Sequence, residues 1–188
     1  GNKTPTRNSY YVRVDEDPKI YTVRTYSIDR FFTQLNDLRD RQIAVPDIQA
    51  ITYFRLENER VMEIVKMEED DNFIGSQFAS LKLAQPYRTE RSIDSQRFSE
   101  MVETLPTALS IVRFVEDAPQ DLKQYDLDPP KYQWIMRDEQ SFIHLLVGGD
   151  AGEDEVFAKR PADNMVFTLP KSALAFLNTD PFRLADKF

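Results

Sequence analysis

The residues of this chain that could do chemistry are few, and the densest group is an acidic run at positions 150–155. It contains Asp150, Glu153, Asp154 and Glu155. Hard cations such as Ca²⁺ are bound by clustered carboxylate oxygens, so these four side chains are candidate metal ligands. The run lacks the alternating D-x-[DN]-x-[DN]-G spacing of an EF-hand loop. A solvated hairpin turn is the competing interpretation, and no metal site is predicted.

Catalytic side chains are scarcer still. His144 is the only histidine, and the absence of cysteine excludes thiolate metal sites, cysteine nucleophiles and disulfides. His144 stands in the apolar run 142–146, either as a lone ligand-contacting imidazole or as one member of a cross-strand pair. No serine lies in a G-x-S-x-G elbow. We therefore predict no enzyme, no catalytic residue and no cofactor. A carboxylate-dependent hydrolase is left as an alternative, because the separation of two carboxylates is set by the tertiary structure.

Two aromatic residues form a candidate surface for a protein partner. Tyr132 and Trp134 are two positions apart, so in a strand they share one face. Packing in the core is the other common fate of such a pair. If the face is exposed, it is the first place to expect partner contact.

The composition narrows the classes of partner. The chain of 188 residues carries 24 Lys and Arg against 32 Asp and Glu, a net charge of −8. A field of that sign repels phosphate backbones, so no nucleic-acid binding is predicted. No apolar run approaches the ~20 residues of a membrane span. Hydrophobic residues make up 41% of the chain, which is enough for a folded core.

An internal repeat organises the chain. Residues 10–42 match residues 156–188 without a gap, with five identical and eight conservative pairs. The clearest pairs are Tyr11/Phe157, Arg13/Lys159, Asp17/Asp163, Ile20/Val166, Tyr21/Phe167, Thr22/Thr168, Val23/Leu169, Ile28/Leu174, Phe31/Leu177, Thr33/Thr179 and Leu38/Leu184. Each copy predicts a hairpin followed by a helix, the first over 10–14, 19–24 and from Ser27, the second over 156–159, 165–169 and from Pro170. Such a self-match indicates a repeated structural unit.

The residues between the copies predict further strands and one more helix. Alternating polarity indicates strands over 48–57, 61–67, 78–83, 109–115, 132–137 and 142–147. Apolar residues at helical spacing after Ser95 indicate a second amphipathic helix, ended by Pro106. Hairpin-length connections dominate, so we predict an α+β fold of mainly antiparallel sheets with two or three amphipathic helices.

The repeat also predicts the division of the chain. Residues 1–9 are expected to be a disordered tail or tag remnant. Residues 10–42 are expected to be a first hairpin–helix module, the tail of a preceding repeat unit. Residues 43–188 are then one complete repeat unit that ends in the second module, residues 156–188.

A family resemblance rests on the segment Asp121-Leu122-Lys123-Gln124-Tyr125-Asp126-Leu127-Asp128-Pro129-Pro130. It resembles the signature dL-x-x-Y-G-L-D-x-P of the bacterial domain-of-unknown-function family 4340, with Asp126 where the signature has Gly. The family's "vG" turn is similar to Val147-Gly148. Its closing hairpin and helix are similar to Val156-Phe157-Ala158-Lys159, Val166-Phe167-Thr168-Leu169 and Leu184-Ala185-Asp186-Lys187.

The resemblance implies a location and a set of partners, but no chemistry. Members of this family are typically held by one N-terminal transmembrane helix and face outside the cytoplasm. Their genes often neighbour components of gliding-type ABC transporters, which would be the protein partners. No catalytic residue is established for the family, so the resemblance assigns none here. We expect a non-catalytic extracytoplasmic interaction or structural module, with calcium binding or hydrolysis at the acidic loop as the alternative.

Overall fold

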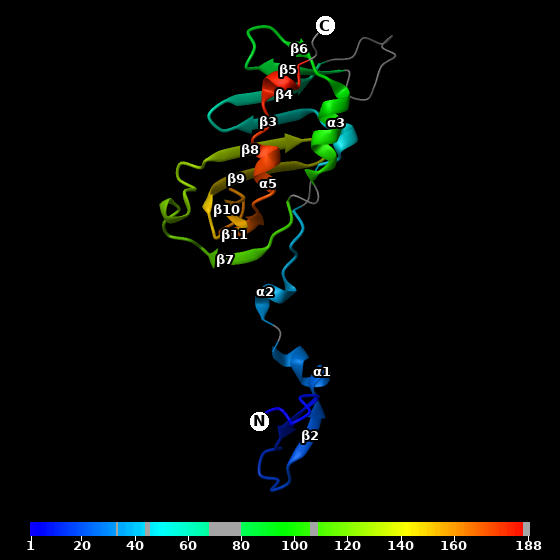
Figure 1. Cartoon of the computed structure of the whole chain (residues 1–188), viewed down its shortest axis with the longest axis vertical. Helices are drawn as coiled ribbons and strands as arrows, with labels where there is room; N and C mark the ends of the chain where they lie inside the picture. Colours follow the sequence, from blue (N-terminus) through cyan, green and yellow to red (C-terminus); the bar gives the residue numbers. More distant parts are fainter. Residues whose placement is uncertain (33, 44–45, 68–79, 106–108, 186–188) are drawn as a thin grey trace. The chain divides into compact units, whose positions relative to one another are not determined.

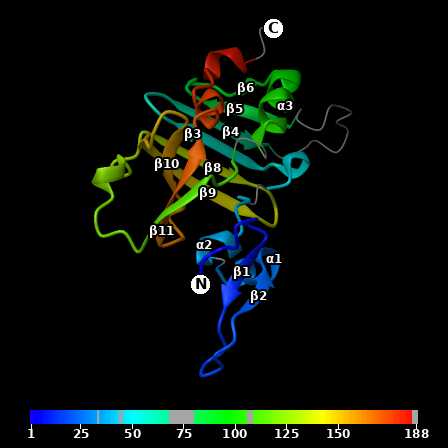
Figure 2. The same ribbon diagram turned by 60° about the horizontal axis from the view of Figure 1, so that its bottom comes forward.

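The computed structural model describes residues 1–32, 34–43, 46–67, 80–105 and 109–185. Two compact units make up the chain, an N-terminal unit of Gly1–Asp40 and a C-terminal unit of Arg41–Phe188 (Figures 1 and 2). Strands outnumber helices, and every strand pair described is antiparallel. The predicted α+β class with mainly antiparallel sheets is confirmed. None of the described helices is long and apolar enough to cross a membrane.

The N-terminal unit is a hairpin followed by short helical turns. Strand β1 (Ser9–Val12) pairs with β2 (Tyr21–Arg24). The predicted single helix is divided into α1 (Thr25–Ile28), the 3₁₀ turn η1 (Asp29–Phe32) and α2 (Leu35–Leu38). Gln34 adopts an extended backbone (ψ 154°) and begins α2 in a capping box with Asp37, so the helix restarts there.

The expected disordered tail is wrong for the first residues of the chain, because they fold back on β1. The amide of Tyr11 donates to the carbonyl of Asn2 at 3.0 Å, and the amide of Thr4 donates to that of Ser9 at 2.8 Å. Lys3 also forms an isolated bridge with Tyr10. Backbone pairing therefore orders this segment although it contributes no core residue.

The C-terminal unit is built on one nine-stranded sheet with the order β6-β5-β4-β3-β8-β9-β10-β11-β7 (Figure 1). Its strands are β3 (Tyr53–Glu57), β4 (Val61–Lys66), β5 (Leu81–Gln85), β6 (Arg91–Ser92), β7 (Arg113–Asp117), β8 (Tyr132–Arg137), β9 (Phe142–Asp150), β10 (Glu155–Lys159) and β11 (Met165–Pro170). The helical elements are η2 (Ile48–Ala50), α3 (Ser95–Glu103), η3 (Lys123–Tyr125), α5 (Ala173–Leu177) and η4 (Pro181–Arg183).

One face of the sheet is buried under α3 and α5. Alternate residues of β3 and β8 point into this core, where Phe54 and Trp134 have no exposed surface. The Phe54 ring meets Phe98 of α3 edge-on at 5.9 Å and Phe176 of α5 at 6.1 Å. Both helices therefore cover the same face, and a cluster of aromatic rings joins them to the sheet.

Several predicted elements are shifted in the structure. The strand predicted over 48–57 is shortened to β3, because Asp47 caps η2 by accepting from the amide of Gln49. Strand β9 continues three residues past its predicted end at Val147, and β11 runs on to Pro170, so the second helix begins at Ala173. Pro106, predicted to end α3, and the first residues of the strand predicted over 78–83 lie outside the described residues.

The two copies of the repeat share one hairpin register at the constant spacing. Tyr10 pairs with Val23 as Val156 pairs with Leu169, and the neighbouring pairs agree in the same way. The turn bond from the Asp17 amide to the Val14 carbonyl recurs from Asp163 to Arg160. The strand-end bond from Thr25 to Asn8 recurs from Lys171 to Asp154, and the helix start at Gln34 recurs at Asp180. The repeat in sequence is therefore a repeat in backbone structure.

The segment that carries the family signature packs closely on β9. Asp126 has a left-handed backbone (φ 53°), which explains why a glycine suits this position. A Cβ atom at Gly148 would collide with the carbonyl oxygen of Tyr125. The Tyr125 hydroxyl donates to Glu116 of β7, and this hydrogen bond raises the pKa of Tyr125 to about 12.

Candidate functional site

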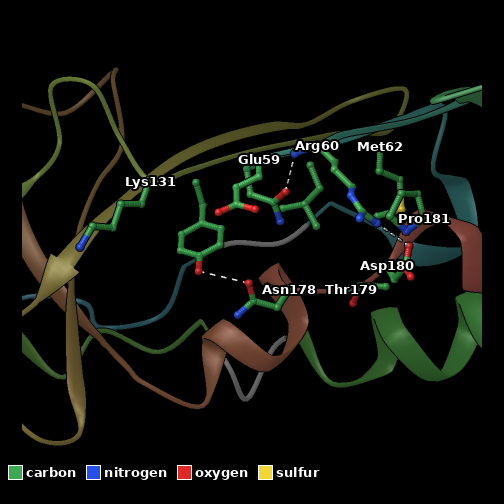
Figure 3. Close-up of a pocket in the computed structure, with 11 residues that line it drawn as sticks. Glu59, Arg60, Met62, Lys131, Asn178, Thr179, Asp180 and Pro181 are labelled. Carbon is green, nitrogen blue, oxygen red and sulfur yellow. Dashed lines mark hydrogen bonds and ion pairs between the residues drawn. The ribbon is translucent and has the colours of Figure 1, made fainter.

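A cavity of ≈ 590 Å³ opens at one end of β3, β4 and β8, and it is the candidate functional site (Figure 3). Three segments that are distant in sequence build it: the β3–β4 turn, the start of β8 and the loop between α5 and η4. Its lining comprises Leu56, Asn58, Glu59, Arg60, Met62, Lys131, Tyr132, Asn178, Thr179, Asp180 and Pro181. Its volume lies in the range of roughly 300–1,000 Å³ that is typical of ligand pockets.

Asn58 holds the β3–β4 turn against the end of α5. Its side-chain oxygen accepts from the amide of Arg60 at 2.8 Å. Its side-chain nitrogen donates to the carbonyl of Leu177 at 3.1 Å. Because that carbonyl lies in the last turn of α5, it has no partner within the helix. One amide side chain thus fixes two of the three segments that surround the cavity.

Tyr132 connects the start of β8 to the same loop. Its hydroxyl donates to the side-chain oxygen of Asn178 at 3.1 Å (Figure 3). Asn178 is the C-cap residue of α5, and its backbone N–H donates to the carbonyls of Leu174 and Phe176. With its oxygen engaged by the hydroxyl, the Asn178 side chain keeps its N–H groups for a ligand.

The rim of the cavity carries charges of both signs. Arg60 lies 3.6 Å from Asp180, which also caps η4 by accepting from the amide of Phe182. Lys131 pairs with Asp126 at 3.0 Å, and this hydrogen bond raises the pKa of the lysine. Because the cationic side chains are each paired with a carboxylate, the rim suits a neutral or mixed-charge ligand better than a phosphate.

The cavity lacks the parts of a hydrolytic centre among its described residues. Its only hydroxyl besides Tyr132 belongs to Thr179, which donates to the carbonyl of Phe176 at 2.7 Å. His144 lies elsewhere, on β9 opposite Ile135, with its ring nitrogen 2.9 Å from the Gln133 amide. Partial burial lowers the pKa of His144. Among its described lining residues, no nucleophile is joined to a base.

The structure separates the two residues of the predicted partner surface. Tyr132 is half-buried and lines the cavity. Trp134 has no exposed surface and contacts Phe176 at 5.7 Å and Phe54 at 6.4 Å in the core. Trp134 is therefore corrected from a surface residue to a core residue, because α5 covers it, while the partner role of Tyr132 stays a prediction.

The acidic run 150–155 does not form a metal site in the described structure. Asp150 pairs with Lys171 at 3.2 Å, and Glu155 pairs with Arg113 at 3.1 Å. Hydrogen bonding, first from Thr168 and then from Arg113, lowers the pKa of Glu155. No group of three or more His, Cys, Asp or Glu side chains among the described residues is placed to hold a metal ion. Glu153 and Asp154 stay exposed, as the hairpin-turn interpretation expects.

Sequence reasoning missed most of the residues that line the cavity. For Asn58 and Arg60, the sequence indicated only a polar turn between two strands. For Asn178 and Asp180 the indication was weaker, because a helix end is a usual place for side chains that cap backbone groups. The meeting of these segments depends on the strand order of the sheet, which no local pattern contains.

The comparisons with known proteins give one match. The model of the family described as "Domain of unknown function (DUF4340)" matches residues 1–130 and residues 107–188. The two hairpin–helix modules fall in separate matches, and together the matches span all 188 residues. No curated protein matches the chain significantly. No solved structure matches it significantly either.

Proposed function

We propose that this chain, which belongs to the DUF4340 family, is a non-catalytic interaction module that holds a segment of a protein partner in the cavity around Tyr132. The observation that carries the proposal is the lining of the cavity. Side-chain amides of Asn58 and Asn178 and the Tyr132 hydroxyl surround it, and its two cationic side chains are paired with carboxylates. A polypeptide offers alternating N–H and C=O groups, which such side chains bind in either direction.

Its size supports a short peptide segment rather than a broad protein interface. A volume of ≈ 590 Å³ accommodates a few side chains, whereas a stable protein–protein interface buries about 800 Å² on each partner. The partner is then recognised by one inserted loop or terminus. Apolar Leu56, Met62 and Pro181 at the base receive a hydrophobic side chain, while the polar rim fixes the backbone.

The place of action that we propose is extracytoplasmic, with the module anchored to the membrane through a segment outside the described structure. The partner is then a component of a gliding-type ABC transporter. Both parts follow from the family's usual setting. The net charge of −8 supports a protein partner over a nucleic acid.

Site-directed photo-crosslinking in the protein's own cells tests the proposal. A photo-reactive residue at Glu59, on the rim of the cavity, should cross-link to one transporter component. The matched control is Glu139, an exposed residue in the turn between β8 and β9. Asn178→Ala should weaken the cross-link at Glu59, because it removes the amide that faces the ligand.

Equal cross-linking from Glu59 and Glu139 would show that the cavity does not select the partner. A partner that is neither a transporter component nor extracytoplasmic would overturn the proposed setting but leave the binding role. Protease added from outside decides the location independently. Its cleavage of the module is compared in intact cells, in cells with a permeabilised envelope and in lysed cells. A module that is cut only after lysis would contradict an extracytoplasmic place.

A further inference from the structure

The N-terminal module exposes side chains whose equivalents in the second module are buried. Ile20 is 71% exposed, Phe31 85% and Leu38 74%. At the constant spacing of the repeat their equivalents are Val166, Leu177 and Leu184, which are 0%, 0% and 2% exposed. All three positions carry an apolar residue in both copies. Exposed large apolar side chains concentrated in one small unit mark a surface that another structure covers.

The second module shows what covers such a face. Its hairpin is paired on both edges, with β9 beside β10 and β7 beside β11. Ala158 pairs with Val147, and Phe167 pairs with Phe114. The helical part of the module then packs into the core next to Trp134, through Phe176. Two strands and the core between them are therefore the natural complement of this module.

The edges of the first hairpin match this complement. Strand β2 has no neighbour other than β1 in the described sheets. Among the described residues, the outer edge of β1 pairs with the segment around Asn2 and Thr4, which corresponds to the last residues of β9. Lys3 pairs with Tyr10, and Asp150 pairs with Val156. At the constant spacing of the repeat, Tyr10 corresponds to Val156, and the two partners differ by one residue in register. Residues 2–4 therefore pair with β1 where the last residues of a β9-like strand would pair.

We infer that the N-terminal module completes a preceding repeat unit of the same polypeptide, which supplies a β9-like strand to β1, a β7-like strand to β2 and an apolar core to Phe31 and Leu38. The inference is independent of the cavity and of its proposed ligand. A single peptide strand added to β2 would satisfy the edge but leave the helical turns uncovered. A whole repeat unit covers both, with residue types already matched by the second module.

An extended chain tests this directly. A duplicate of residues 41–146, joined directly ahead of Gly1, keeps the period of the repeat and places a β9-like strand ahead of Asn2. Phe31→Lys should leave unfolding of the original chain unchanged, because that side chain is exposed. In the extended chain the same substitution should lower the unfolding midpoint about as much as Leu177→Lys, its matched control in the second module.

Hydrogen exchange gives a second readout that does not depend on substitutions. Amides of β2 should exchange at least ~10-fold more slowly in the extended chain than in the original. Unchanged exchange of β2, or a silent Phe31→Lys in the extended chain, would overturn the inference, and so would an extended chain that aggregates. If the original chain forms dimers that Ile20→Lys separates, the cover is a second copy of this chain and the preceding unit is wrong.

Discussion

Replacement of Trp134, the only tryptophan of the chain, separates its packing from its hydrogen bonding. Trp134 is completely buried and contacts the rings of Phe54 and Phe176 edge-on. Its indole Nε1 has no hydrogen-bond partner among the described residues. Trp134→Ala removes the ring and leaves a cavity, and Trp134→Phe removes the N–H but keeps an aromatic ring in place.

The two substitutions should differ widely in their effect on the free energy of unfolding. Trp134→Ala should cost about 3–5 kcal/mol, the usual loss for a buried aromatic side chain. For Trp134→Phe, the lost part of the indole is worth about 2 kcal/mol at ~0.8 kcal/mol per buried carbon. Removal of a buried unpaired donor returns about 1–3 kcal/mol. We therefore expect Trp134→Phe to change stability by no more than about 1 kcal/mol.

Urea unfolding followed by far-UV circular dichroism measures both variants on one scale. In the parent chain, fluorescence reports on this one indole, and it should be shielded from acrylamide until the C-terminal unit unfolds. A Trp134→Phe variant as damaged as Trp134→Ala would refute the reasoning, because it would show that the indole N–H is bonded in the native state. A Trp134→Ala variant of parental stability would instead show that the ring lies on a surface.

Further predictions concern the turn between β8 and β9, the family signature and the acidic loop. Asp138 accepts hydrogen bonds from three backbone amides and one hydroxyl, foremost that of Ser141, which hold its pKa well below the usual range. Asp138→Asn should therefore lose stability near pH 6, and the difference from the parent should shrink as the pH falls below about 4, as thermal unfolding across pH can measure. Gly148→Ala should cost about 1–3 kcal/mol in urea unfolding, since it meets a backbone carbonyl. Gly149→Ala should cost less, because it meets only a movable carboxylate. Calcium and EDTA should leave Tm unchanged, because Asp150 and Glu155 are already paired with Lys171 and Arg113, and a calcium-dependent rise would contradict this.

The sequence predicted those parts of the fold that depend on local pattern. Strand β8 has the predicted bounds, and α3 begins at the predicted Ser95 with Asp94 as its cap. Alternation and capping are local, so one segment is enough to read them. The single helix predicted after Ser27 is wrong: Phe31, Leu35 and Leu38 are exposed, and no described side chain of α1 or α2 is buried in a core that would hold the turns in one helix. Tertiary packing supplies most of the stability of short helices.

The candidate site was less predictable because it joins three distant segments. The sequence made Tyr132 a candidate partner contact, and the structure places it in the lining of the cavity. The pairing of β3 with both β4 and β8 brings Asn58 and Lys131 to one end of the sheet. Strands β4 and β8 are far apart in sequence. The hydrophobic periodicity of each segment does not show that both pair with β3. Trp134 was ambiguous for a similar reason, since spacing assigns a face to a residue but not what covers that face.

The most specific motif of the family builds structure rather than a binding site, which explains why recognition of the family does not reveal its function. Tyr125 contacts Phe157 of β10 edge-on at 4.9 Å between ring centroids and donates to Glu116 of β7, so it joins the signature segment to the second module and to β7. Leu127 is buried, and Gly148 allows the close approach of this segment to β9. The side chains of the cavity lie outside the signature, so the residues that identify the family are not those of the candidate site.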